Sequence, residues 1–162
     1  MEKIIVCSYD DNLLPKKQSL GAVCRDMKAS IDFEVQPGEI KLISAWFKTY
    51  LPVWWVCKFY ARSGLPTKAH LMQANSTAIM DHDYRWEYQM QMYNFTKEVV
   101  KHEKYTRLCQ MEFTPCYVWP GKFGTDDIPD IEFVVDKEMY DSFEKRFETE
   151  RWAGGIWSTG FK

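Results

Sequence analysis

Short runs of alternating or apolar residues, separated by turn residues, fill most of this 162-residue chain. Side chains in a strand alternate between two faces, so runs of this kind are typical of β-strands. Turn formers such as those of 36–38 and 120–121 stand between them. Many short strands at regular spacing favour an all-β barrel or sandwich over a parallel sheet covered by helices. The strand-like runs are 3–8, 31–35, 40–47, 53–60, 69–74, 87–93, 107–113, 115–119 and 131–135.

One segment near the carboxyl end departs from the strand pattern. Its apolar residues recur at helical spacing, and Asp136 stands before them as a potential N-cap. We therefore predict one short helix over 136–147, whose apolar stripe packs against the strands. The residues of this stripe are Met139, Tyr140, Phe143 and Phe147.

Composition excludes several classes of protein. The length suits one domain, and a formal net charge of −2 gives no reason to expect nucleic-acid or membrane-surface binding. No apolar run is long enough to span a bilayer, and residues 1–10 lack a signal-peptide layout, so we expect a cytoplasmic protein.

The five cysteines form no C-x-x-C pair and are expected to be reduced, mostly buried thiols. The three histidines are scattered, which argues against a structural zinc site.

The most informative motif is the segment Asn75–Arg85, which combines an amide, two carboxylates and a tyrosine. We read it as a hairpin-like turn, with Asp81 and Asp83 on one side of an extended chain. Four further segments accompany it in order: Gly21–Ala29, Arg62–Leu65, Arg107–Met111 and Arg151–Gly160. This ordered set resembles the five motifs of the trimeric dUTPase family, and the resemblance runs from about residue 14 to residue 160.

The resemblance implies a fold, an assembly and a reaction. The fold is an all-β, jelly-roll-like β-barrel of the dUTPase type over residues 1–150, followed by a flexible, glycine-containing arm over 151–162 that closes over the active site. The assembly is a homotrimer whose active sites are shared between subunits. The reaction is hydrolysis of dUTP to dUMP and diphosphate, which keeps uracil out of DNA and supplies dUMP for dTMP synthesis.

Hydrolysis at the α-phosphate requires an oriented water, a base that takes its proton, and cations that spread the phosphate charge. The resemblance makes Asp81 the base, although on its own this residue would be read as an aspartate that bonds its own turn. It also places Asp26 near a Mg²⁺ ion, which Asp26 contacts through bound water. Mg²⁺ suits this role because it keeps water ligands and binds largely to substrate phosphates.

The same resemblance assigns the contacts to base and sugar. Tyr84 would lie under the deoxyribose and exclude a ribose 2′-hydroxyl. Asn75 would touch uracil, and the backbone of 76–80, including substrate-binding Ile79, would pair with the uracil edge. Without the other motifs, Tyr84 would be an ordinary strand aromatic.

The phosphate contacts fall in three segments. Ser63 and Gly64 would form a turn that faces the phosphates, because glycine lets the backbone approach and the hydroxyl donates. On the arm, Ile156 replaces a phenylalanine that stacks on uracil in the family, which alters that contact. The other residues implied in phosphate binding are Arg62, Arg107, Gln110, Arg151, Ser158 and Thr159.

Seven tryptophans beside eight glycines is an unusual balance. At least five of the seven stand where the family pattern usually has glycine, and a side chain forced into left-handed backbone geometry costs roughly 1–2 kcal/mol per site. We hypothesise that the source organism reads UGA as glycine; the alternative is a divergent relative that repacked around real tryptophans. The five positions are Trp46, Trp54, Trp86, Trp152 and Trp157.

Two other functions use the same architecture. A dCTP deaminase shares the fold and trimer but needs a glutamate acid/base in the hairpin, where this chain has the D-x-D-Y-R form. A non-catalytic nucleotide-binding or regulatory relative is favoured by the altered arm. The retained set argues against it: Arg62, Ser63, Asp81, Tyr84, Gln110 and Arg151.

Overall fold

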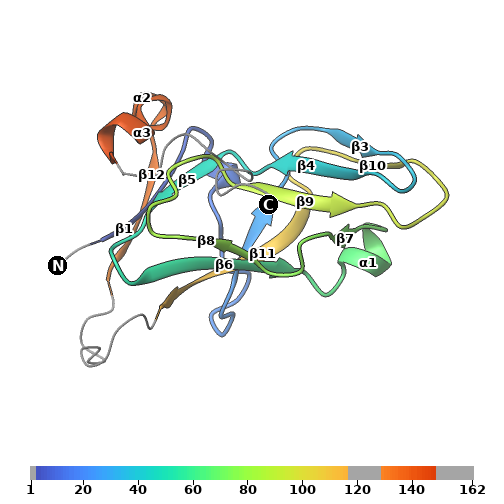
Figure 1. Ribbon diagram of the computed structural model, residues 1–162, viewed down its shortest axis with the longest axis horizontal. Coiled ribbons are helices and arrows are strands. Elements are labelled where there is room, and N and C mark those ends of the chain that lie inside the picture. Colours follow the sequence, from blue (N-terminus) through green and yellow to red (C-terminus); the bar gives the residue numbers. More distant parts are fainter. Residues whose placement is uncertain (1–2, 117–128, 149–162) are drawn as a thin grey trace, which may run out of the picture.

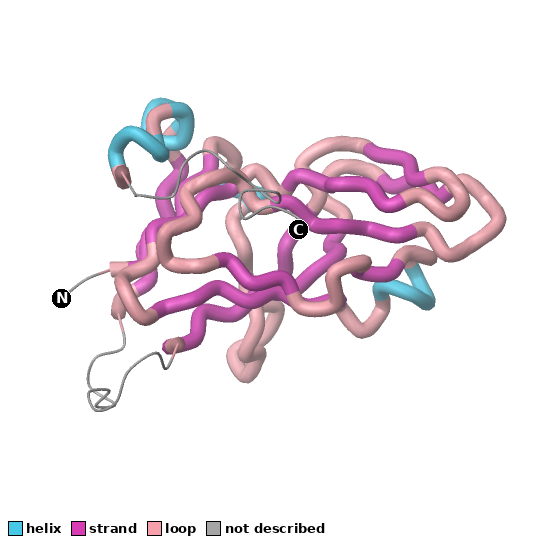
Figure 2. Tube along the Cα trace, viewed as in Figure 1, coloured by secondary structure: helices cyan, strands magenta, loops and turns pink. Residues whose placement is uncertain are grey.

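A computed structural model describes residues 3–116 and 129–148, and it is mostly β with a few short helices. Figure 1 and Figure 2 show strands running along the length of the molecule, with two helices packed at one end. The strands form several small twisted sheets, and the sheets are not closed into a continuous barrel. The arrangement fits the jelly-roll-like prediction.

The longest sheet has the order β2-β11-β6-β8 and is antiparallel throughout. Its strands are β2 (Arg25–Lys28), β11 (Arg107–Pro115), β6 (Trp55–Ala61) and β8 (Ala78–Met80). Opposite it lies the sheet β4-β9-β7, made of β4 (Ile40–Ser44), β9 (Gln89–Tyr93) and β7 (Met72–Gln73). A helical turn, α1 (Leu65–Lys68), follows β6.

The two remaining sheets lie at the ends of the molecule. One has the order β12-β1-β5, in which β1 (Ile4–Ser8) pairs in parallel with β12 (Ile131–Val135) and antiparallel with β5 (Phe47–Tyr50). The other pairs β3 (Phe33–Val35) with β10 (Val100–His102). A 3₁₀ turn, η1 (Asp11–Leu13), follows β1.

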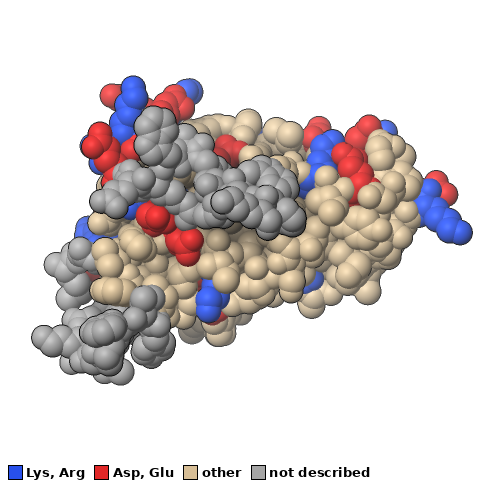
Figure 3. All heavy atoms as spheres, in the orientation of Figure 1, with Lys and Arg blue, Asp and Glu red and all other residues tan. Residues whose placement is uncertain are grey.

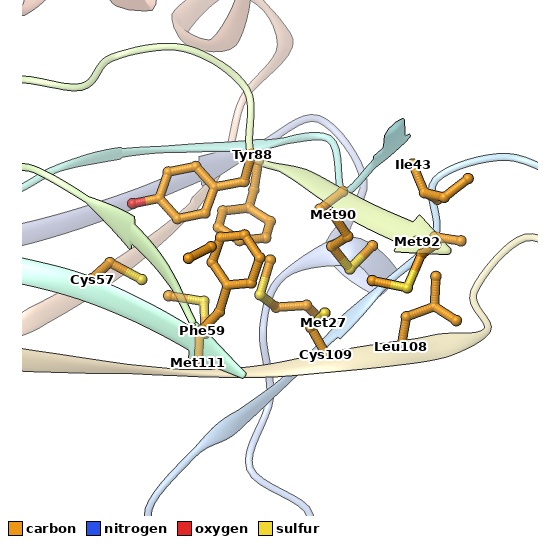
Figure 4. Packing of buried hydrophobic residues seen from close by; sticks show 14 of the residues in the cluster. Met27, Ile43, Cys57, Phe59, Tyr88, Met90, Met92, Leu108, Cys109 and Met111 are labelled. Carbon is orange, nitrogen blue, oxygen red and sulfur yellow. The ribbon is translucent and has the colours of Figure 1, made fainter. Parts of the chain in front are cut away.

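The core lies between these sheets and is rich in aromatic and sulfur-containing side chains. Figure 4 shows Tyr88 and Phe59 facing each other, with methionines of β2, β9 and β11 filling the space beside them. The Tyr88 hydroxyl lies 2.7 Å from Thr49 Oγ1, which satisfies a fully buried polar group. All five cysteines are free, and burial raises the pKa of the Cys7 thiol to about 11. Three of the five, Cys7, Cys57 and Cys109, are buried as expected; that the thiols are reduced stays a prediction.

The predicted carboxyl-terminal helix is two helices. Asp136 Oδ1 accepts the Met139 N–H at 2.8 Å, so the predicted cap is confirmed. The first helix, α2 (Lys137–Asp141), ends at Ser142, whose hydroxyl donates to the Glu138 carbonyl, and α3 (Phe143–Arg146) follows. A serine hydroxyl that donates to the carbonyl four residues earlier can bend a helix, which explains why α2 and α3 are separated at Ser142. The apolar stripe is nevertheless inward: Met139, Tyr140 and Phe143 are buried against Cys7.

Two of the five questioned tryptophans have left-handed backbone conformations. Trp46 has φ = 50° and separates β4 from β5, so the predicted strand over 40–47 is two strands. Trp54 has φ = 75° in a turn closed by the Trp55 N–H and the Pro52 carbonyl at 3.0 Å. A turn that requires positive φ at its third residue normally has glycine there. Trp86 has no positive φ, and Trp152 and Trp157 lie outside the described residues.

Candidate active site

Four of the predicted phosphate-side residues meet on neighbouring strands. Asp26 on β2 lies opposite Gln110 on β11, and its buried carboxylate receives two arginines. The Arg62 Nε is 3.0 Å from Asp26 Oδ1, and the Arg107 Nη1 is 3.1 Å from Asp26 Oδ2. Both guanidinium groups remain partly exposed. The ion pair between Arg107 and Asp26 was not predicted from the sequence.

Two supporting contacts complete this arginine cluster, which we define as Asp26, Arg62, Arg107 and Gln110. The Gln110 amide donates to the Ala61 carbonyl at 3.3 Å, and Arg107 donates to Gln18 Oε1 at 2.8 Å. Gln18 was not predicted, and nothing in its local pattern marks it. Beside the cluster, Ser63 is exposed, and Gly64 precedes α1 with φ = −85°.

The uracil-side residues lie on a second group of elements. Asn75 stands in the turn between β7 and β8, where its side-chain oxygen accepts the Gln73 amide at 3.2 Å. These two strands pair with different partners, β9 and β6, so the segment is not the two-stranded hairpin suggested by its sequence. Ile79 on β8 is exposed and opposes Lys58.

Asp81 follows β8 directly and begins a tight turn. The Tyr84 N–H donates to the Asp81 carbonyl at 3.1 Å, which closes the turn over 81–84. Asp81 itself is exposed, so its carboxylate can meet a ligand. Tyr84 is only 6% exposed; its hydroxyl donates to the Glu87 carbonyl at 3.0 Å, and Trp86 packs edge-on against its ring.

The Asp81 turn and the arginine cluster lie toward opposite ends of β6, whereas Asn75, which precedes β8, lies toward the end where the cluster is. Met80 pairs with Cys57, whereas Arg62 comes five residues later, just past the end of the strand. At the rise of a β-strand, five residues span roughly 17 Å. One chain therefore does not bring Asp81 next to its own arginine cluster.

The described residues contain no cluster of three or more histidine, cysteine or acidic groups that could bind a metal ion. Both oxygens of Asp26 already accept arginine. The described residues therefore do not provide the oxygen ligands that a permanently bound Mg²⁺ ion needs. They are compatible with a Mg²⁺ ion that is bound mainly by the phosphates of the substrate. The predicted arm residues Arg151, Ile156, Ser158 and Thr159, and the boundary at 150/151, lie outside the described residues.

A comparison with protein families matches residues 10–132 to the dUTPase model. The chain belongs to the dUTPase family. A deoxyuridine 5′-triphosphate nucleotidohydrolase of Desulfitobacterium hafniense is 33% identical over 150 residues, which cover 91% of this chain and 87% of that protein. The crystal structure of a dUTPase from Streptococcus mutans superposes with a TM-score of 0.66 and 31% identity, covering 70% of this chain and 94% of the other.

A more distant likeness shows the fold alone. A variant dUTPase from phage phi11 of S. aureus superposes with a TM-score of 0.64 at 16% identity, covering 78% of this chain and 98% of that one, and its structure is described with a structural Mg(II) ion. Among the described residues of this dUTPase, no helix is long and apolar enough to cross a membrane.

Proposed function

We propose that this protein is a dUTP diphosphatase, which hydrolyses dUTP to dUMP and diphosphate. The family match and the named relatives support this reaction. The observation that carries it in this chain is the arginine cluster, in which residues from two other motifs, Arg62 and the pair Arg107 and Gln110, meet Asp26. Its free thiols suit a reducing compartment, and we assign it to the cytoplasm.

The arginine cluster serves the triphosphate. Arg62 and Arg107 are oriented by one buried carboxylate, and each guanidinium keeps further N–H donors for phosphate oxygens. Ser63 adds an exposed hydroxyl beside them. In the proposed site, Arg151, Ser158 and Thr159 of the arm bind the terminal phosphates, and Ile156 covers the uracil. A Mg²⁺ ion bound to the substrate phosphates would neutralise part of their charge, with Asp26 beside its bound waters.

Asp81 activates the water. Its exposed carboxylate accepts the proton as the water oxygen attacks the α-phosphorus, the bond to the bridging oxygen of the β-phosphate breaks, and diphosphate leaves. Asn75 and the backbone around Ile79 contact the uracil. Asp26 acts on this step only indirectly, by fixing the arginines and the water shell of the substrate-bound Mg²⁺.

The separation along β6 supports a homotrimer with shared sites. An Asp81 turn from one subunit would meet the arginine cluster of another, since a single chain keeps them roughly 17 Å apart. The outer face of β4-β9-β7 offers a surface for assembly: Ile40, Tyr93 and Met72 align in register across it, and Ile40, Met72 and Leu42 are exposed. Figure 3 shows that the face around β7 is largely uncharged.

A charge on this face is expected to prevent assembly. Leu42→Asp should yield a folded monomer by sedimentation equilibrium, with dUTP turnover reduced in parallel, because half of each site would be missing. Lys41→Asp, on the neighbouring position of the same strand, is the matched control and should stay trimeric. An active Leu42→Asp monomer would contradict the shared site.

Sugar discrimination tests the role of Tyr84. We expect dUTP to be preferred over UTP by about 10²-fold in kcat/KM, the discrimination typical of a closely fitted pocket against one added hydroxyl. Parallel assays of diphosphate release from the two nucleotides measure this ratio. Comparable turnover of UTP and dUTP would remove that role from Tyr84.

One assay decides between the candidate functions. The protein is incubated with Mg²⁺ and either dUTP or dCTP, and the products are analysed for diphosphate and ammonia. Diphosphate from dUTP supports the proposal. Ammonia from dCTP would indicate a deaminase, and binding without either product would indicate a non-catalytic relative.

A further inference from the structure

Arg85 is an arginine enclosed at the base of the Asp81 turn. Its side chain is only 5% exposed, and its guanidinium carbon lies 5.0 Å from the centre of the Tyr50 ring. Nη1 donates to the carbonyls of His82 and, at 3.3 Å, of Tyr84. Nε donates to the Phe147 carbonyl at 3.0 Å. A single guanidinium therefore binds two carbonyls of the turn and the end of the helical segment.

The turn and the helices share a second connection. Glu87 accepts hydrogen bonds from Ser44 and, at 2.6 Å, from the Tyr140 hydroxyl of α2. Its own carbonyl accepts the Tyr84 hydroxyl. Residues 82–87 are thus attached to the helical segment at two points, through Glu87 and through Arg85. Arg85 also donates to the carbonyls of His82 and Tyr84 in the turn.

We infer that Arg85 is a positioning residue, which sets the orientation of the Asp81 carboxylate and the Tyr84 ring; the inference rests on the proposed function. A planar fork with fixed N–H directions can bind three carbonyls at once, whereas a lysine ammonium cannot reproduce that geometry. A shift of about 1 Å in a catalytic group can lower a rate by about 10²-fold. Because Arg85 links the turn to the end of the helical segment over 137–147, the position of that segment fixes the position of Asp81 and Tyr84.

The test compares Arg85→Lys with Lys48→Met, each as the full-length trimer. Lys48 is a second buried cation bound to the same helices: it donates to the Tyr140 carbonyl at 2.8 Å and pairs with Glu144 at 2.7 Å. We expect Arg85→Lys to lower kcat for dUTP at least tenfold per folded enzyme, with KM changed less than threefold. Lys48→Met should lower Tm while keeping kcat within twofold.

Each outcome has one meaning. If Arg85→Lys lowers Tm and leaves kcat unchanged, Arg85 is structural only and the inference is wrong. Equal losses of kcat in both variants would also overturn it, because loosening the helices would then suffice. Asp81→Asn is measured alongside: if that variant turns over at the parental rate, the proposed function fails, whatever Arg85 does.

The backbone at Trp46 and Trp54 carries a second, independent inference. Gly38 and these two tryptophans have positive φ values of 50–75°, a region that bulky side chains rarely adopt, although His70, Ser76 and Tyr105 also adopt it here. Trp54 is also 42% exposed, so little packing offsets its strain. Trp55, the next residue, is buried in β6 with no positive φ. Adjacent positions therefore differ in whether the backbone suits a tryptophan.

We propose that the natural protein has glycine at positions 46 and 54, because its source reads UGA as glycine. The test is the codon sequence of the gene together with the intact mass of the protein purified from its own source or host. We expect UGA at positions 46 and 54, UGG at the internal control Trp55, and a mass lower than that of the printed sequence. UGG at position 46 or 54 would overturn the proposal, as would a mass that matches tryptophan at both.

Discussion

Replacing Asp81 with asparagine is expected to lower dUTP turnover by roughly 10²–10⁴-fold, the usual contribution of a general base. Asparagine keeps the size of the side chain and the turn over 81–84, so nucleotide binding should change by no more than a few-fold. Diphosphate release measures turnover, and calorimetry with a non-hydrolysable dUTP analogue measures binding.

The matched control for this prediction is Asp83→Asn, which removes a carboxylate from the same turn. We expect it to keep most of its turnover, since Asp81 alone is assigned to the water. If Asp83→Asn is the inactive variant and Asp81→Asn turns over normally, the base has been assigned to the wrong carboxylate.

Exchanging Trp54 for glycine is expected to stabilise the fold, whereas the same exchange at Trp55 is expected to destabilise it severely. Removing the left-handed strain at position 54 should raise the free energy of unfolding by about 1–2 kcal/mol. The greater freedom of glycine in the unfolded chain should lower it by about 0.4–1 kcal/mol. Trp55 is 9% exposed, and removing a buried tryptophan costs about 3–5 kcal/mol or more. The two neighbouring variants should therefore differ in unfolding free energy by at least ~3 kcal/mol.

Denaturant unfolding of the two variants beside the parent measures this contrast. Trp46→Gly should gain less than Trp54→Gly, because the Trp46 ring packs against Tyr9 with centroids 4.9 Å apart. A loss of several kcal/mol in Trp54→Gly would show that its indole is needed, and would favour a divergent protein that repacked around real tryptophans.

The fold was predictable where local chemistry decides it. Asp136 and the apolar stripe behind it indicated a capped helical segment, because a cap and its first turn lie within a few residues of each other. Strands β2, β8 and β10 were missed because they are short and partly polar, and pairing with distant strands holds them in place. The break in the run 40–47 comes from the backbone at Trp46, which an apolar pattern does not reveal.

The sequence indicated which residues to consider for the candidate site. It did not indicate how those residues contact one another. Motif order identified Asp26, Arg62 and Arg107, but their convergence depends on the register of β2, β11 and β6. Arg85 was noticed only as part of a motif, since its three carbonyl partners come from the folded backbone. The burial of Tyr84 beneath Trp86 likewise has no signature in the sequence.

The shared carboxylate of Asp26 has a consequence for how the enzyme meets its ligand. Arg62 and Arg107 are already held by Asp26 without a nucleotide, so under the proposed function little side-chain entropy would be lost when they bind the phosphates. The three charges sum to a modest local excess of one positive unit, which draws a polyanion without locking it in place. In the proposed site, a preorganised phosphate-binding group with a small net positive charge would therefore bind dUTP without holding the diphosphate product tightly.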